Sequence, residues 1–169
     1  ITYMTLLKIF TTMDIKHFLK SMAPVQLLGF STSSSGATLP VTMKRCEKDL
    51  GISEEISSFV LPLGATINMD GTALYQGVAA VFIAQAVGMD LTLANQFTIV
   101  ATAVLASIGT AAVPGAGIIM LIIILEAINV PSEGIALILG VDRILDMIRT
   151  ATNVTGDATV ASVMDSLER

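Results

Sequence analysis

The chain has 169 residues, of which 53% are hydrophobic and 14% are charged, and its formal net charge is −5. Soluble domains carry about 25% charged residues, so this composition indicates a membrane protein and excludes intrinsic disorder, which needs low hydrophobicity and high charge. An acidic chain also lacks the basic stripe that nucleic-acid binding needs. The single cysteine, Cys46, excludes an internal disulfide, and the lone His17 supplies too few ligands for a metal site.

The first residues carry charges that interrupt an apolar stretch, and no signal peptide with a charged head and a cleavage site is visible. The chain begins with Ile1 rather than with Met. We therefore expect residues 1–13 to be the end of a preceding transmembrane helix, and the chain to be the C-terminal part of a longer membrane protein.

Residues 14–50 combine a helical arm with a small polar run. The arm covers 15–30, and the run 31–38 ends at Leu39-Pro40. Such Ser/Thr/Gly runs are often flexible linkers. Between membrane-type segments, however, non-helical backbone must line a cavity or be buried in protein, because the bilayer offers it no water. The pattern therefore predicts a first re-entrant hairpin over 14–50, with a linker as the alternative.

The segment 51–90 is predicted to be an interrupted transmembrane helix. Between Ile56 and Leu125 only Asp70 and Asp90 are charged, and about 20 apolar residues suffice to span a bilayer. The polar run Asn68–Thr72 breaks this apolar pattern in its middle.

The connections differ in basic residues, which sets the expected orientation. The connection 41–55 holds Lys44, Arg45 and Lys48, whereas 88–91 and 126–133 hold no Lys or Arg. Basic residues in short connections favour the cytoplasmic side. We expect 41–55 to be cytoplasmic and 88–91 to be external.

A second re-entrant hairpin is predicted over 91–130. The arms 92–106 and 118–128 are too short to cross a core of roughly 30 Å at about 1.5 Å per residue. The stretch Gly109 to Gly117, with its glycines and Pro114, is a poor helix and a good loop. One long kinked span is the alternative.

The last segment, 131–169, carries a polar stripe. At 100° per residue its polar side chains fall within roughly 80° of one another. The stripe consists of Asp142, Asp146, Arg149, Asn153 and Asp157. In a soluble protein it would be an ordinary surface face, but in a bilayer each central charge costs about 2.5–3.5 kcal/mol. Such residues normally face a cavity and mark a substrate or ion path.

The stripe suggests a specific chemistry. The planar fork of Arg149 suits a carboxylate, and Asp146, which is placed to pair with it at i, i+3, suits a substrate ammonium group. A site with both charges fits an acidic amino acid better than a plain dicarboxylate. The isolated Asp70 needs a cation, and broken helices supply the carbonyl oxygens that hold Na⁺.

The two halves of the chain have similar patterns. Each has a hairpin with small residues at its tip, followed by a span interrupted near an asparagine. The second interruption is expected at Asn153–Asp157. Weak internal symmetry of this kind points to a transporter with inverted repeats. The expected fold is an all-α membrane protein with two re-entrant helical hairpins and two broken or amphipathic transmembrane helices in an inverted repeat.

Four motifs in this order closely resemble the glutamate transporter family, the dicarboxylate/amino acid:cation symporters. They are Ser33-Ser34-Ser35 with Thr38-Leu39-Pro40, Pro62 to Thr72, Ala106 to Thr110 with Val113 to Gly117, and Asp142 to Asp157. The resemblance runs from about residue 14 onward and implies the transport core of a multi-pass protein of the inner or plasma membrane. It also implies lipid contacts and a homotrimer assembled through an N-terminal scaffold that the chain lacks. The implied activity is cation-coupled symport of glutamate or aspartate.

The resemblance also implies site residues. The substrate would be bound by Ser35, Thr72, Val113, Asp146, Arg149, Thr150 and Asn153, with the second hairpin as the external gate. One Na⁺ would use Gly64, Asn68, Asn153 and Asp157. A second would use Thr66, Ser107, Ile108 and Thr110, and a third Asn68 and Asp70.

Departures from the family leave alternatives open. The chain lacks the second arginine that relatives carry at Ser33 or Met147, and we hypothesise that Arg143 fills that role near the first hairpin tip. H⁺ is the alternative to Na⁺, and a C4-dicarboxylate is the alternative substrate. An intramembrane protease is disfavoured because the chain has no base near the serine run. A passive channel is disfavoured because it would leave the charged stripe without a ligand. We therefore expect a transporter and no enzyme.

Overall fold

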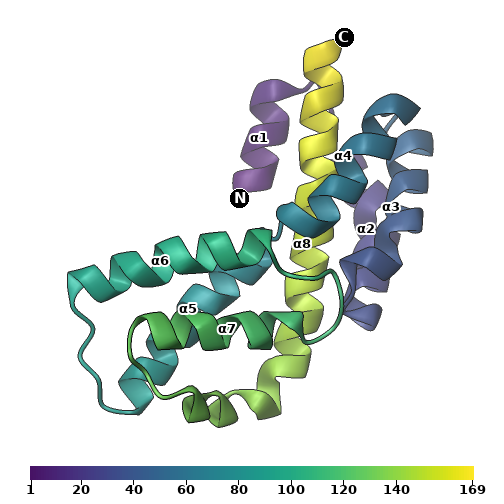
Figure 1. Ribbon diagram of the computed structural model, residues 1–169. Coiled ribbons are helices and arrows are strands. Elements are labelled where there is room, and N and C mark those ends of the chain that lie inside the picture. The colour runs from purple at the N-terminus through teal and green to yellow at the C-terminus, as the bar shows by residue number, and fades with distance from the viewer.

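The computed structural model describes residues 1–169 and consists of helices, with no strand (Figure 1). Its elements are α1 (Thr2–Phe10), α2 (Ile15–Thr32), α3 (Ser35–Lys48), α4 (Glu54–Ile67), α5 (Asp70–Ala86), α6 (Leu93–Ile108), α7 (Ala116–Ala127), the 3₁₀-helix η1 (Ser132–Leu137) and α8 (Leu139–Glu168). The all-α prediction is confirmed. Taken one at a time, none of these helices is both long enough and apolar enough to cross a membrane.

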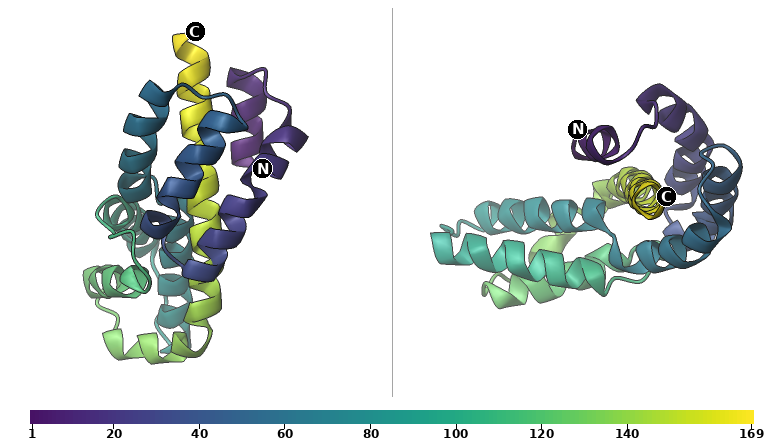
Figure 2. Two further views of the ribbon diagram at one scale, coloured as in Figure 1. Left: turned by 90° about the vertical axis from the view of Figure 1, so that its right-hand side faces the viewer. Right: turned by 90° about the horizontal axis from the view of Figure 1, so that it is seen from above.

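The long helix α8 is the axis of the fold. Helices α1 to α4 pack around its C-terminal half, and α5, α6, α7 and η1 gather at its N-terminal half, on opposite sides when viewed from above (Figure 2). Each group has its own apolar core. One core joins Ile83, Ile99 and Leu121 of the second group, and the other joins Phe18 and Leu61 to Val154 of α8.

Helices α2 and α3 pack against each other as a hairpin with a very short connection. Only Ser33 and Ser34 lie outside the helices, so the expected non-helical run over 31–38 is wrong. Helix α3 starts early because the Ser34 side chain accepts a hydrogen bond from the Ala37 N–H at 3.1 Å, as an N-cap does. Pro40 lies inside α3, where its missing N–H removes one helical bond.

The break in the segment 51–90 is confirmed. Asn68 and Met69 have ψ values of 62° and 58°, far from helical geometry, and they separate α4 from α5. The first N–H groups of α5 have no carbonyl of their own helix to donate to. The break places these groups in the middle of the fold.

Helices α6 and α7 are antiparallel neighbours, not one kinked helix (Figure 1). Their connection ends at Gly115, whose φ of 78° favours glycine. Helix α8, by contrast, runs without interruption through Asn153–Asp157, so the expected second break is wrong. No proline lies there, and the Thr155 hydroxyl donates to the Ala151 carbonyl of the same helix at 2.7 Å.

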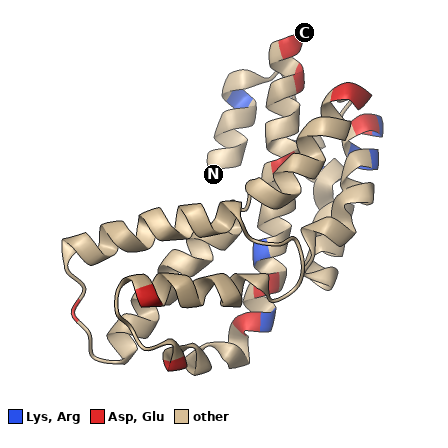
Figure 3. Cartoon of the chain, viewed as in Figure 1, with Lys and Arg blue, Asp and Glu red and all other residues tan.

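Charged residues are unevenly distributed over this fold. Outside α8 they are densest at the end where α3 meets α4, with isolated charges on α1, α7, η1 and the α5–α6 connection, and α6 carries none (Figure 3). Large apolar side chains are exposed on α5 and α6, among them Leu74, Phe82, Phe97 and Leu105. The faces of these helices that turn away from the apolar core are therefore apolar as well.

Candidate functional site

The polar stripe of α8 faces inward as a unit. Asp142, Asp146, Arg149, Asn153 and Asp157 are all between 3% and 7% exposed, whereas Arg143 and Ile148, on other faces of α8, are exposed. The prediction that these five residues share one face is confirmed. Arg143 contributes nothing to the buried stripe.

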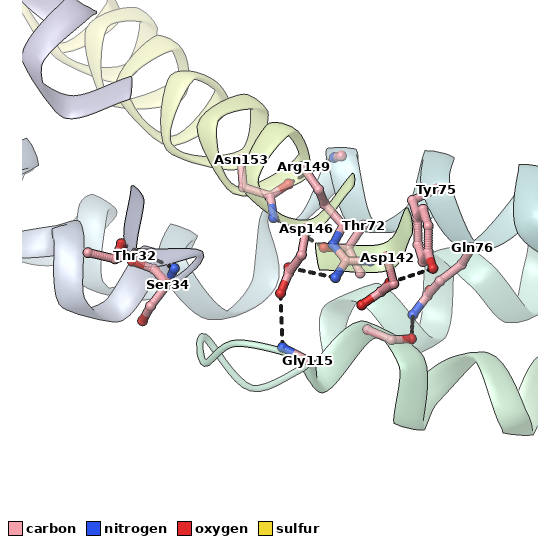
Figure 4. Close-up of polar contacts among 12 residues, drawn as sticks. Thr32, Ser34, Thr72, Tyr75, Gln76, Gly115, Asp142, Asp146, Arg149 and Asn153 are labelled. Carbon is pink, nitrogen blue, oxygen red and sulfur yellow. Dashed lines mark hydrogen bonds and ion pairs between the residues drawn. The ribbon is translucent and has the colours of Figure 1, made fainter. Parts of the chain in front are cut away.

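The ion pair between Asp146 and Arg149 lies at the centre of the stripe. The Nη2 atom of Arg149 is 2.6 Å from Oδ1 of Asp146, as the i, i+3 spacing predicts (Figure 4). The other oxygen of Asp146 accepts a hydrogen bond from the Gly115 N–H at 3.0 Å. A single carboxylate therefore links α8 to the tip of the second hairpin.

Arg149 is held from α5 as well. Its Cζ atom lies 4.4 Å from the centre of the Tyr75 ring, which is a cation–π distance. The Tyr75 hydroxyl donates to Asp142 at 2.6 Å, so that ring is fixed in turn (Figure 4). The Nη1 atom of Arg149 is buried and has no hydrogen-bond partner. The guanidinium thus keeps its Nη1 group free to donate to a ligand.

Asn153 fixes the broken end of α5 against α8. Its Oδ1 atom accepts from the Gly71 N–H at 2.8 Å, and its Nδ2 atom donates to the Thr72 hydroxyl at 3.1 Å. Gln76 donates to the Gly117 carbonyl of α7 at 3.2 Å. Tyr75 and Gln76 are not among the residues predicted for the site. Their signal was their spacing of three and four residues after Thr72, which places them on one face of an otherwise apolar helix.

A cavity of about 20 Å³ lies where the two hairpin tips, α5 and α8 meet. The seven residues predicted to bind substrate all line it: Ser35, Thr72, Val113, Asp146, Arg149, Thr150 and Asn153. The remaining walls include Ser33, Met69 and Gly117, but not Arg143. Such a space holds about one water molecule, so an amino acid can enter only if a hairpin tip moves.

The two hairpin tips are tied directly together over this cavity. The Ser34 hydroxyl donates to the Ala112 carbonyl at 2.7 Å, and the Gly36 N–H donates to the same carbonyl at 3.3 Å. Together with the Gly115–Asp146 bond, these contacts hold the second tip against the first tip and α8. Opening the cavity requires breaking them.

Replacing Ser34 with glycine is expected to loosen this closure. Ser34→Gly removes the hydroxyl bond to Ala112, while a glycine N-cap costs α3 only a few tenths of a kcal/mol. One net hydrogen bond contributes about 0.5–1.5 kcal/mol, so the open state should become about two- to tenfold more populated. The measurement is the labelling rate of an Ala116→Cys reporter, which lines the cavity.

The matched control is Ser53→Gly, which changes the N-cap of α4. Cys46 is buried and should add little background labelling. Equal labelling in the Ser34→Gly and Ser53→Gly proteins would contradict a closing role for Ser34.

The residues predicted for the first cation lie close together. The Asn68 side chain donates to Oδ1 of Asp157 at 3.0 Å, and a Cβ atom added to Gly64 would lie 2.9 Å from the same oxygen. Asn153 lies one turn before Asp157 on α8. The buried Asp157 carboxylate takes part in no ion pair, and a buried carboxylate needs compensation. This donor set of one carboxylate with neutral oxygens fits a monovalent cation.

The other two predicted cation sets are less complete. Thr66 and Ile108 are exposed, whereas Ser107 and Thr110 are buried, and the three hydroxyls in this set each donate to a carbonyl three or four residues earlier. Asp70 is exposed and accepts a hydrogen bond at 2.9 Å from the hydroxyl of Tyr3, a residue the sequence analysis did not identify. No cluster of three or more His, Cys, Asp or Glu side chains is arranged to hold a metal ion.

Comparison with known proteins relates this chain to transporters. Residues 1–167 match the sodium:dicarboxylate symporter family. Excitatory amino acid transporter 3 of Mus musculus is 49% identical over 90% of this chain, which corresponds to 29% of that protein. The proton/sodium-glutamate symport protein of Bacillus subtilis (strain 168) is 49% identical over 92% of this chain and 36% of its own length. The chain therefore spans about a third of the length of these relatives.

Proposed function

Because the chain belongs to the sodium:dicarboxylate symporter family, we propose that it forms the substrate-binding core of a cation-coupled symporter for acidic amino acids. The observation that carries the proposal is the buried Asp146–Arg149 pair in the wall of the cavity between the hairpin tips. This family is a transporter family and not one of enzymes.

The charges of the site match those of glutamate or aspartate. The Arg149 guanidinium, whose Nη1 atom has no partner, would take a carboxylate in two parallel hydrogen bonds once Asp146 releases Nη2. Asp146 would exchange its bonds to Arg149 and Gly115 for the substrate ammonium group. A plain dicarboxylate offers nothing to Asp146, so the site favours an amino acid over succinate. Thr72, Thr150 and Asn153 supply neutral polar groups beside this pair.

Coupling to Na⁺ is supported by the site of Asp157. A cation beside its carboxylate would neutralise a buried charge that forms no ion pair in the protein. Since Asn68 contacts Asp157 directly and lies in the break between α4 and α5, ion binding there would stiffen the break that positions Thr72. Filling the cation site would thereby prepare the substrate site.

The same proposal places the protein in the cell membrane as a multi-pass protein. The exposed apolar side chains of α5 and α6, such as Phe82 and Phe97, suit lipid or other apolar segments of the full-length chain. Re-entry of the two hairpins into the bilayer from opposite sides belongs to this proposal. Assembly as a homotrimer rests on the family resemblance alone.

The test is uptake of labelled aspartate by the full-length protein in vesicles, with Na⁺ and H⁺ gradients imposed separately. We expect an inward Na⁺ gradient to raise the initial rate at least tenfold over its absence, and aspartate to outcompete succinate. Uptake driven by an H⁺ gradient alone would show that the coupled ion is H⁺ and not Na⁺. Absence of aspartate uptake under every gradient would refute the function.

A further inference from the structure

Tyr3 connects the helix that precedes the first hairpin to the break between α4 and α5. It lies on α1, which packs against α8 (Figure 1). Its hydroxyl donates a hydrogen bond at 2.9 Å to Oδ2 of Asp70, the first residue of α5. The two residues are 67 positions apart in the sequence. A side chain from outside both hairpins therefore reaches one of the predicted cation ligands.

Gly156 of α8 makes room for this contact. A Cβ atom added to Gly156 would lie 2.7 Å from the Tyr3 hydroxyl oxygen, 3.0 Å from Cζ of that ring and 3.1 Å from Nδ2 of Asn68. A side chain at this position would therefore displace the hydroxyl and the amide together. The same Asn68 amide donates to Asp157 at 3.0 Å. The Tyr3 hydroxyl thus contacts one predicted cation ligand and shares the notch at Gly156 with another.

The bond from Tyr3 orients Asp70 without neutralising its charge. Asp70 is exposed and forms no ion pair. A phenolic hydroxyl is neutral and donates a single hydrogen bond, so it engages one carboxylate oxygen and leaves Oδ1 for a further ligand. A lysine or arginine in the same place would cancel the charge instead. The carboxylate therefore keeps its attraction for a cation while it loses the freedom to turn away.

We propose that Tyr3 is a positioning residue for the coupled cation, whose hydroxyl holds the Asp70 carboxylate in the arrangement that binds the ion. This inference rests on the proposed function, because it deepens the cation coupling assigned there. It adds a residue of α1 to cation sites that were predicted only from later segments of the chain. A ligand that is already held in place spares the ion the cost of ordering it, so the affinity for the cation depends on how α1 is packed.

The experiment compares Tyr3→Phe with the wild-type full-length protein. Phenylalanine keeps the ring beside Gly156 and removes only the hydroxyl. The Na⁺ concentration for half-maximal aspartate uptake should rise about tenfold, which is the effect of losing one hydrogen bond to a charged group. The maximal rate and the aspartate KM at saturating Na⁺ should stay unchanged. A second readout needs no transport: without aspartate, the purified variant should need about tenfold more Na⁺ than the wild type for the same rise in Tm.

Two further variants show whether Tyr3 acts through Asp70. Thr5→Val is the matched control on α1, because the Thr5 hydroxyl donates to the Ile1 carbonyl four positions earlier, and it should leave both readouts at wild-type values. In an Asp70→Asn background, Tyr3→Phe should cause no further change, because the effects of two residues that share one contact are not additive. A full tenfold shift in that background would overturn the proposal, since Tyr3 would then act through another group.

A merely structural role for Tyr3 predicts a different pattern. Tyr3→Phe would then lower Tm equally with and without Na⁺, and the Na⁺ dependence of uptake would stay at its wild-type value. That outcome would overturn the inference and leave the proposed function intact. A wild-type protein that Na⁺ does not stabilise would overturn the inference as well, whereas a wild-type protein that takes up no aspartate under any gradient would refute the function.

Discussion

Arg149→Cys is expected to abolish transport of acidic amino acids, with at least a hundredfold loss of affinity for aspartate. The guanidinium is the only cationic group among the residues lining the cavity, and its planar fork can donate two parallel hydrogen bonds to a carboxylate. Hydrogen bonds to charged groups contribute about 1.5–3 kcal/mol each, so losing two of them accounts for this factor. The measurement is aspartate binding and uptake by the full-length protein.

The design must separate loss of substrate binding from loss of folding. Arg149→Cys leaves Asp146 buried without its partner, and breaking a buried ion pair typically costs about 3–5 kcal/mol of stability. The double variant Asp146→Asn with Arg149→Cys removes both charges and should recover much of that stability while uptake stays absent. Normal amounts of this double variant in the membrane would show that the lost uptake is a binding defect.

Arg143→Cys is the matched control on the same helix. Arg143 is exposed and lies outside the cavity, so we expect wild-type uptake, which would also reject its hypothesised role near the first hairpin tip. Retention of aspartate affinity by Arg149→Cys would overturn the assignment of the carboxylate site.

The parts of the site that could be predicted from the sequence are those encoded by local periodicity. The stripe from Asp142 to Asp157 follows from helical spacing alone, and the break at Asn68 follows from polar residues inside an apolar run. Both features are present. Where local signals conflict, the prediction fails. The serine run looked like a loop, but a single N-cap contact at Ser34 starts α3 within it.

Contacts between distant parts of the chain could not be predicted in this way. Ser34 and Ala112 are 78 positions apart, and their bond depends on how the two hairpins are placed around α8. The stacking of Tyr75 on Arg149 depends likewise on the packing of α5 against α8. No periodicity in one segment encodes the position of another. The closure of the cavity is therefore a property of the fold that only the structure reveals.

Gly64→Ala is expected to raise the Na⁺ concentration for half-maximal uptake at least tenfold. The added Cβ atom would lie 2.9 Å from Oδ1 of Asp157, a separation at which the carboxylate must move. Moving it also disturbs the hydrogen bond from Asn68, so two of the predicted cation ligands lose their arrangement together. The measurement is the Na⁺ dependence of aspartate uptake at saturating aspartate.

Gly77→Ala separates this contact from a general effect on helices. Both glycines lie within helices, where alanine is favoured over glycine by roughly 0.5–1 kcal/mol, but a Cβ atom at Gly77 would meet no atom within 4 Å. Both variants gain the same helical preference, and only Gly64→Ala crowds Asp157. An unchanged Na⁺ dependence in Gly64→Ala would remove Asp157 from the cation site. A tenfold rise in the Na⁺ concentration for half-maximal uptake in Gly64→Ala, with wild-type behaviour in Gly77→Ala, would show that ion binding depends on the Asp157 carboxylate. That carboxylate lies two turns beyond Arg149 on α8.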